Sequence, residues 1–409
     1  MIEIPGYRVL SQIYESANSQ VYRGIRESDE RAVIVKLLKQ DFPTVAELAR
    51  YKQEYEIIRN LKLNGVIKAY GLETYQRTLA LILEDFGGVS LKTWMRDSAL
   101  ADRLANRQLN LWEFLNIAIE IAECLEQIHA ANIIHKDINP SNIVYNPETK
   151  QIKIIDFGIA TAIAGSQTPL KNPTVLEGTL AYISPEQTGR MNRSIDYRTD
   201  FYSLGVTFYE MLCNALPFET LDPMELVHCH IAKQPVPPHQ INPEISPALA
   251  GIVLKLLAKN AEDRYQSAWG VKADLVLALM QLESSGKIEY IVPGEHDISD
   301  KFQISQKLYG RKAEIETLLA AFERVSVHRK GDKRDKEVEV ISSPSSPSSS
   351  SPVTTELVLV AGSAGVGKSA VVQEICKSVT KGGGYFISGK FDQLQRNIPY
   401  KAIVSAFQE

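Results

Sequence analysis

Two acidic side chains and one amide stand close together in the stretch from Ile133 to Gly158. Asp137 belongs to an H-x-D turn, Asn142 follows five residues later, and Asp156 opens a D-F-G after a short β-rich run. Mg²⁺ prefers carboxylate and amide oxygens as ligands, and a transferring phosphoryl group needs a metal to offset its negative charge. A further carboxylate has to orient the attacking hydroxyl. The spacing therefore predicts phosphoryl transfer, with Asn142 and Asp156 as Mg²⁺ ligands and Asp137 as proton acceptor.

The surrounding segments have the patterns of elements that would hold these residues in place. Residues 111–130 carry apolar side chains at helical spacing and lead directly to the H-x-D turn, which predicts an amphipathic helix packed in a core. Residues 45–61 also have helical periodicity. Strands are predicted over 7–10, 20–25, 31–37 and 79–84.

Five separated motifs occur in an order that resembles a protein kinase. They are A-V-I-V-K ending at Lys36, H-K-D-I-N-P-S-N ending at Asn142, D-F-G from Asp156, S-P-E ending at Glu186, and N-A-E-D-R-Y around Arg264. The resemblance covers Tyr7 to about Leu282 and implies an α+β, bilobal protein-kinase fold that binds ATP between a β-rich lobe and a helical lobe. The run I-N-P-S-N is closer to Ser/Thr than to Tyr kinases.

The same resemblance implies roles for several residues of the first lobe. Lys36 would hold the α and β phosphates of ATP and take part in catalysis, and Val21 would contact the nucleotide after the glycine-rich loop. The partner of Lys36 should be a glutamate of the helix over 45–61, which carries Glu54 and Glu56 on different faces. Counting back from Leu61 favours Glu54, with Glu56 on a solvated face.

Two departures from the kinase pattern concern phosphate binding. Aligning Val21 with the motif puts Tyr14, Ser16 and Ser19 where three glycines are expected, and side chains there keep backbone N–H groups farther from phosphate. Asn139 replaces the lysine that neutralises γ-phosphate charge. Losing one pre-aligned donor typically costs ~2.7 to 4 kcal/mol, although the Asn139 amide retains two N–H donors and with them part of the catalytic role.

Composition limits the other possibilities. A chain of 409 residues suggests two to three domains. A net charge of −4 and no basic stripe give no reason to expect nucleic acid as a partner. The four cysteines are scattered without a C-x-x-C pair, which indicates reduced thiols and a cytoplasmic protein. No segment approaches the ~18 apolar residues of a membrane span, so no membrane partner is predicted.

Beyond the kinase-like region the sequence changes character more than once. We predict a kinase domain over 1–282, a connector over 283–325 with a helix at 309–325, and a linker over 326–356. The linker contains S-S-P-S-S-P-S-S-S-S-P, which cannot bury a core and should be disordered. Residues 357–409 then read as the N-terminal, truncated part of an α/β P-loop ATPase domain.

A second nucleotide motif carries that last interpretation. The apolar run E-L-V-L-V-A leads into G-S-A-G-V-G-K-S, and a helical pattern follows. Gly362, Gly365 and Gly367 would let backbone amides surround phosphates. Lys368 would reach the β and γ oxygens, and Ser369 would ligate Mg²⁺.

A kinase, a linker and an AAA/STAND-like P-loop domain in this order resemble the front end of bacterial, cyanobacterial-type multidomain signalling kinases. The runs H-K-D-I-N-P-S-N and S-P-E-Q-T-G-R-M-N-R look characteristic of that group. The resemblance implies a Ser/Thr protein kinase that uses ATP and Mg²⁺ on protein substrates and is fused to or partnered with other signalling modules. The alternative is an ATP-binding pseudokinase or scaffold that regulates the fused ATPase. Lys36, Asp137 and Asp156 favour catalysis, whereas Asn139 and the glycine-poor loop favour the alternative.

Overall fold

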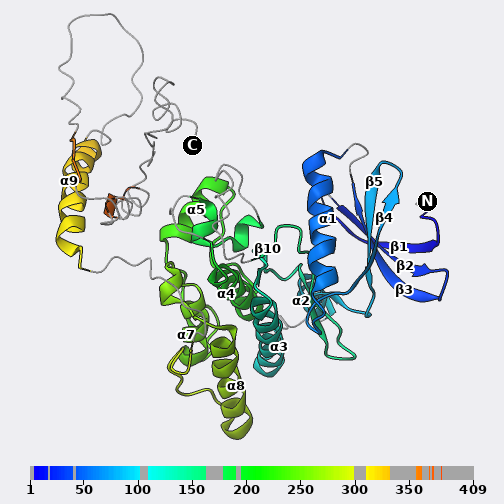
Figure 1. The fold of residues 1–409 in the computed structure, drawn as a ribbon. Coiled ribbons are helices and arrows are strands. Elements are labelled where there is room, and N and C mark those ends of the chain that lie inside the picture. Colours follow the sequence, from blue (N-terminus) through cyan, green and yellow to red (C-terminus); the bar gives the residue numbers. More distant parts are fainter. Residues whose placement is uncertain are drawn as a thin grey trace, which may run out of the picture.

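The structure is a computed structural model that describes residues 4–16, 19–39, 43–101, 109–162, 178–189, 195–298, 310–331 and 356–361, with residues 368, 371, 372 and 379. Within these ranges the chain forms a lobe built on a β-sheet and a second lobe built of helices (Figure 1). The predicted disordered linker lies outside the described residues, except at its two ends.

An antiparallel sheet of five strands forms the first lobe, in the order β1-β2-β3-β5-β4. Its strands are β1 (Tyr7–Glu15), β2 (Ser19–Arg26), β3 (Arg31–Leu38), β4 (Ala69–Tyr75) and β5 (Thr78–Glu84). Val33, Val35 and Leu37 are buried on one face of β3. Because side chains alternate along a strand, Lys36 belongs to the opposite face, which packs toward the helix α1.

The helix α1 (Val45–Asn60) covers this second face. It begins at Thr44, whose side chain accepts from the backbone of Glu47 while the Glu47 carboxylate accepts from the backbone of Thr44. Such a reciprocal cap fixes where a helix starts. The buried side chains of α1 are Tyr51, Glu54 and Ile58, so a carboxylate lies on the face that meets the sheet.

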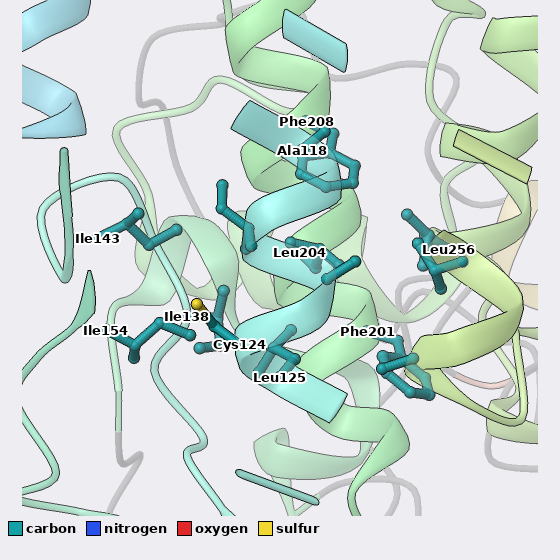
Figure 2. Packing of buried hydrophobic residues seen from close by; sticks show 14 of the residues in the cluster. Ala118, Cys124, Leu125, Ile138, Ile143, Ile154, Phe201, Leu204, Phe208 and Leu256 are labelled. Atoms are coloured by element: carbon teal, nitrogen blue, oxygen red, sulfur yellow. The ribbon is translucent and has the colours of Figure 1, made fainter. Parts of the chain in front are cut away.

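Long helices form the core of the second lobe. The central pair is α3 (Leu111–Ala130) and the largely buried α4 (Arg198–Cys213), surrounded by α2 (Leu91–Ala101), α5 (Pro223–Ala232), α6 (Pro238–Ile241), α7 (Pro247–Leu256) and α8 (Ala268–Ser285). Figure 2 shows Ile138 in this core with Cys124 and Leu125 of α3. Ile138 is fully buried between Asp137 and Asn139, so core packing fixes the loop that carries both residues.

Short strands and 3₁₀ turns frame this loop. The strands are β6 (Val89–Ser90), β7 (Ile133–Ile134), β8 (Ile143–Tyr145), β9 (Ile152–Ile154) and β10 (Thr161–Ala162), and the turns are η1 (Leu180–Tyr182), η2 (Pro185–Thr188) and η3 (Ala261–Asp263). The pair β8–β9 forms a hairpin between Asn142 and Asp156, and β9 is the short β-rich run that precedes D-F-G.

Several predicted bounds differ from the observed ones. The helix over 111–130 is observed over those residues, whereas the strand predicted at 7–10 continues to Glu15 because it pairs with β2 along its whole length. The helix predicted at 309–325 is α9 (Lys312–Gly331), which enters the predicted linker. No Gly or Pro occurs inside this helix before Gly331, so nothing in its sequence ends it earlier.

The packed part of the second lobe extends beyond residue 282. Ile288 and Ile291 are both 6% exposed and belong to the main core. Asp297 accepts from the Ser267 hydroxyl at 2.6 Å and from the Gln266 backbone N–H at 2.5 Å. A Cβ at Gly270 would lie 2.3 Å from Asp297 Oδ1, so only glycine fits where this segment crosses α8. The region predicted as a connector therefore begins as part of the lobe.

The strand predicted before the P-loop is not observed, because residues 356–361 have no regular secondary structure. Leu357 and Leu359 are 94% and 89% exposed. A strand needs a neighbouring strand for its backbone hydrogen bonds, and none of the described residues pairs with this segment.

Candidate active site

Lys36 joins the two lobes through a pair of carboxylates. Its Nζ donates to Glu54 Oε1 and Oε2 at 2.8 and 3.0 Å, and to Asp156 Oδ1 at 3.0 Å. The strand β3 supplies the lysine, α1 supplies Glu54, and the turn after β9 supplies Asp156. Glu56, the other candidate, has a side chain 60% exposed near Arg59. The structure thus places Glu54, and not Glu56, against Lys36.

One ammonium offsets two carboxylates in this triad. Burial by itself would lower the pKa of Lys36, but the charges of Asp156 and Glu54 outweigh it and raise that pKa. Burial also raises the pKa of Glu54, the most enclosed member, to about 7 against the effect of Lys36. For Asp156 the Lys36 charge outweighs burial, and the pKa is lowered. Lys36 therefore stays cationic and Asp156 stays anionic at neutral pH.

A buried aspartate anchors the loop that carries Asp137. Asp200 of α4 is fully buried, and its carboxylate accepts from the backbone N–H groups of His135 and Lys136 at 2.9 and 2.7 Å. His129 of α3 contacts the same carboxylate at 2.8 Å. Lys136 has φ of +70°, a left-handed conformation that non-glycine residues rarely adopt. The surrounding hydrogen bonds hold this strained turn.

Two of the described residues donate hydrogen bonds to the Asp137 carboxylate. Asn142 Nδ2 donates to its Oδ2 at 2.9 Å, and the backbone N–H of Thr179 donates to its Oδ1 at 2.9 Å. These contacts fix the orientation of the carboxylate. The second contact also connects the H-x-D turn to the G-T pair formed by Gly178 and Thr179.

Asn139 has different partners from those its predicted role requires. Its Nδ2 donates to Asp137 O at 3.1 Å and to Thr179 Oγ1 at 3.4 Å, while its Oδ1 accepts from the Ser141 backbone at 2.9 Å. The residue is only 3% exposed. Both N–H donors of its amide are thus used inside the protein.

Two oxygens near the triad suit a hard cation. Among the described residues, no hydrogen bond uses Asn142 Oδ1 or Asp156 Oδ2, because Asn142 donates through Nδ2 and Asp156 accepts through Oδ1. The Asp156 side chain is 42% exposed, so this carboxylate faces an accessible space. An amide and a carboxylate oxygen are the donor types that Mg²⁺ takes, and the residues present therefore fit that ion.

The turn between β1 and β2 satisfies part of its own backbone. Ser16 N–H donates to Ser19 O at 2.8 Å, and Ser19 N–H donates to Ser16 Oγ at 3.0 Å. The two hydroxyls are also 3.0 Å apart. Tyr14 is 54% exposed, and Val21 pairs with Lys36 across the sheet. Two amides at positions expected to cradle phosphate therefore already have partners.

A buried ion pair fixes the end of the segment that follows Thr179. Arg264 donates to both oxygens of Glu186, at 2.7 and 2.8 Å, and Thr199 Oγ1 donates to the same carboxylate at 2.8 Å. Gln187, the next residue, donates to Lys136 O at 2.8 Å. The predicted pairing of Arg264 with Glu186 is thus present and is linked to the H-x-D turn.

The second D-F-G sequence, which begins at Asp85, has a different position. Arg23 Nε donates to Asp85 Oδ2 at 2.6 Å, and the Gly87 backbone N–H donates to its Oδ1 at 2.9 Å. Asp85 therefore ties the segment between the lobes to β2 and stands apart from the triad.

Of the P-loop candidates, only Lys368 is among the residues that the structure describes. Gly362, Gly365, Gly367 and Ser369 lie outside the described residues, and Lys368 is described as helical. The assignment of a second nucleotide site to these residues remains a prediction.

Sequence reasoning missed the residues that position the catalytic loop. They are Asp200 and His129, which come from two different helices. A charged residue inside the otherwise apolar run D-F-Y-S-L-G-V was the available signal, since burial of a carboxylate requires compensating donors. Glu210, a second buried carboxylate of the same helix, gives the same signal.

A β-rich lobe over a helical lobe, with a Lys–Glu pair and an H-x-D loop between them, defines a protein kinase. The family model described as "Protein kinase domain" matches residues 7–275, and the chain belongs to this family. The model described as "AAA ATPase domain" matches residues 333–409. The predicted α+β kinase fold followed by an ATPase region is confirmed, and both families imply the use of ATP.

Curated relatives come from bacteria and from a slime mould. The hybrid signal transduction histidine kinase G of Dictyostelium discoideum is 31% identical over 384 residues, covering 72% of this chain and 10% of that protein. A probable serine/threonine-protein kinase of Clostridium perfringens is 32% identical (66% of this chain, 38% of that protein). The serine/threonine-protein kinase PknB of Mycolicibacterium smegmatis is 30% identical (67% and 42%). The chain thus spans less than half the length of these relatives.

Among the described helices, none is both long enough and apolar enough to cross a bilayer.

Proposed function

We propose that this chain is a Ser/Thr protein kinase that transfers the γ-phosphate of ATP to protein hydroxyls in bacterial signal transduction. The observation that carries the proposal is the Lys36 ammonium, held by Glu54 within hydrogen-bonding distance of Asp156. The similarity to two bacterial serine/threonine-protein kinases supports the class of acceptor.

Each residue of the site has one task in this proposal. Lys36 binds phosphate oxygens of ATP, with Glu54 fixing its direction and Val21 contacting the nucleotide. Asp137 accepts the proton of the attacking Ser or Thr hydroxyl, since Asn142 and Thr179 hold its carboxylate in one orientation. Asn142 and Asp156 would hold Mg²⁺, which offsets phosphate charge when bound.

Asn139 is better placed to shape the loop than to contact phosphate. Its amide closes a turn from Asp137 to Ser141 and reaches Thr179. We therefore assign it a positioning role in place of the predicted donor role, and phosphate charge is left to Lys36 and the metal.

One observation favours the alternative, an ATP-binding pseudokinase or scaffold. The hydrogen bonds between Ser16 and Ser19 use two amides that a glycine-rich loop would offer to phosphate. Weaker phosphate binding reduces turnover more than it reduces adenine binding, so the two functions differ more in phosphate transfer than in nucleotide affinity.

The substitution Asp137→Asn separates them. Incubation of the chain with radiolabelled ATP, Mg²⁺ and a panel of protein acceptors should label Ser or Thr, and Asp137→Asn should lower the rate at least about 100-fold because the proton acceptor is lost. ATP affinity, measured by calorimetric titration, should stay near the wild-type value since no phosphate or metal ligand is removed. Equal labelling by both proteins would leave the scaffold function as the better account.

The proposal also covers the C-terminal region and the setting in which the kinase unit works. Residues 357–409 would form the first part of an ATPase domain with Gly362, Gly365, Gly367, Lys368 and Ser369 at its phosphate site. The kinase unit would act on protein substrates and communicate with this and other signalling modules. The three buried cysteines described by the structure are free thiols, which supports a reducing, cytoplasmic setting.

A further inference from the structure

A second charged cluster lies where α2 meets α4. Lys92, near the start of α2, contacts Glu210 Oε1, and the Tyr182 hydroxyl donates to Glu210 Oε2. Glu210 is 6% exposed. Because both of its oxygens are used and it is buried, this carboxylate has no accessible face for another cation.

Backbone hydrogen bonds place the cluster beside the catalytic loop. Lys92 N–H donates to Pro140 O at 2.9 Å, three residues after Asp137. Tyr182 N–H donates to Thr179 O at 2.8 Å, and Thr179 in turn donates to the Asp137 carboxylate. Lys92 and Tyr182 are therefore each one short turn away from the proposed proton acceptor.

The accessible charge of the cluster is the ammonium. The Lys92 side chain is 52% exposed, compared with 8% for Glu210. An ammonium has three N–H donors, and Glu210 occupies one side of it. Burial, with the Glu210 charge next in importance, raises the pKa of Tyr182, so its phenol is neutral. A peptide chain approaching Asp137 meets a positive group here.

We propose that Lys92 makes this kinase select protein substrates with an acidic side chain close to the phosphorylated Ser or Thr. The proposal rests on the proposed kinase function and adds the substrate class. A carboxylate of the substrate would pair with the exposed side of the Lys92 ammonium. A lysine or arginine at the same place would be repelled, and Glu210 is too enclosed to attract it.

Binding measured without turnover tests this directly. Fluorescent peptides with Ala in place of the acceptor Ser, and with Glu or Lys scanned through each neighbouring position, are titrated into the full chain with a non-hydrolysable ATP analogue and Mg²⁺. At the position that meets Lys92, we expect the Glu peptide to bind about two- to tenfold more tightly than the Lys peptide, as for a partly exposed ion pair. The preference should shrink as ionic strength rises.

Two variants assign the effect to Lys92. The double variant Lys92→Met/Glu210→Gln removes both charges without leaving an unpaired buried carboxylate, and it should bind Glu and Lys peptides equally. Lys92→Arg retains the positive charge and should keep the preference. Thermal melting checks that both variants are folded. A wild-type protein that prefers Lys peptides, or has no preference at any position, overturns the proposal, as does a double variant that keeps the preference.

The same peptides with Ser restored separate this proposal from the kinase function. Acid-selective binding without phosphate transfer would support the role of Lys92 and contradict the kinase activity. Phosphate transfer to Glu and Lys peptides at equal kcat/KM would support the activity and overturn the role of Lys92.

Discussion

Lys36 is surrounded by groups that come from three separate segments. Its strand places it opposite Val33 and Val35, and the capped helix α1 brings Glu54 to the same side. The H-bonded pair then meets Asp156, whose φ of +63° turns its carboxylate toward the lysine. The position of one ammonium thus depends on strand alternation, a helix cap and a strained turn.

Removing the charge of Glu54 tests this arrangement. Glu54→Gln should lower kcat/KM for phosphate transfer about 10- to 100-fold, because a charge-assisted hydrogen bond that orients Lys36 is lost. Glu56→Gln is the matched control: Glu56 is exposed on the same helix and should stay within about twofold of wild type. A similar loss in both variants would mean that the helix, and not the Lys36 pair, is what matters.

The serines of the β1–β2 turn should affect the affinity for ATP. Ser16→Gly removes the Oγ that accepts from Ser19 N–H and should free that amide for phosphate, tightening ATP binding about two- to tenfold. Ser19→Ala keeps the Ser16 acceptor and should change ATP affinity little. Calorimetric titration of both variants decides it, and unchanged affinity in Ser16→Gly would show that this amide does not contact nucleotide.

The helix α4 contacts several of the segments that form the site. Asp200 near its beginning holds the catalytic loop, Glu210 near its end holds Lys92 and Tyr182, and Thr199 supports Glu186. The helix is buried along its length, so its polar residues need hydrogen-bond partners, most of which come from other segments, while Thr207 donates to Ser203 O of the same helix.

The buried ion pair between Glu186 and Arg264 should contribute to the stability of the helical lobe. Glu186→Gln leaves the buried Arg264 without its counter-charge and should cost about 3 to 5 kcal/mol in the free energy of unfolding. Replacing both residues by apolar ones of similar size should cost less. Denaturant unfolding of the three proteins provides the comparison, and an equal loss in single and double variants would contradict it.

Acid should reduce the difference between wild type and Glu186→Gln. Burial would raise the pKa of Glu186, but Arg264 and the Thr199 hydroxyl outweigh it and the net pKa is lowered from 4.5. A carboxyl with a lowered folded-state pKa contributes stability above its unfolded pKa and loses it as pH falls through the folded value. The difference should therefore persist at neutral pH and narrow below pH 4.5.

The packed part of the kinase unit extends farther along the chain than the family match does. The family match ends at residue 275, yet Ile288, Ile291 and Asp297 still pack on the second lobe. Asp297 contacts the loop that follows Arg264, so this segment touches the residues that support the Glu186 ion pair.

Truncation measures this extension. A protein ending at residue 282 should melt roughly 5 to 10 °C below one ending at residue 298, because two buried isoleucines and the Asp297 hydrogen bonds are lost. Thermal unfolding followed by circular dichroism gives the comparison. Equal melting temperatures would place the boundary of the unit near 282, as the sequence pattern alone indicated.

The order of the motifs, and most of the elements that carry them, can be predicted from the residues alone. H-x-D, D-F-G and the A-V-I-V-K strand predicted the chemistry, and helical periodicity placed α3 over its observed residues. Even the choice of Glu54 over Glu56 followed from counting back from Leu61 along the helix, on which residues two apart face different directions. These features depend on local periodicity and on spacing, which a single chain displays directly.

The partners of the polar groups, in contrast, depend on how distant segments of the chain pack together. The sequence shows that the Asn139 amide has two N–H donors, and the structure shows that Asp137, Ser141 and Thr179 are the partners of this amide group. Lys92 and Glu210 are far apart in the sequence and meet only because α2 packs near α4. Hydrogen-bond partners and burial arise from contacts between distant segments, and for that reason neither the accessible ammonium of Lys92 nor the self-bonded serine turn could be read from residue order.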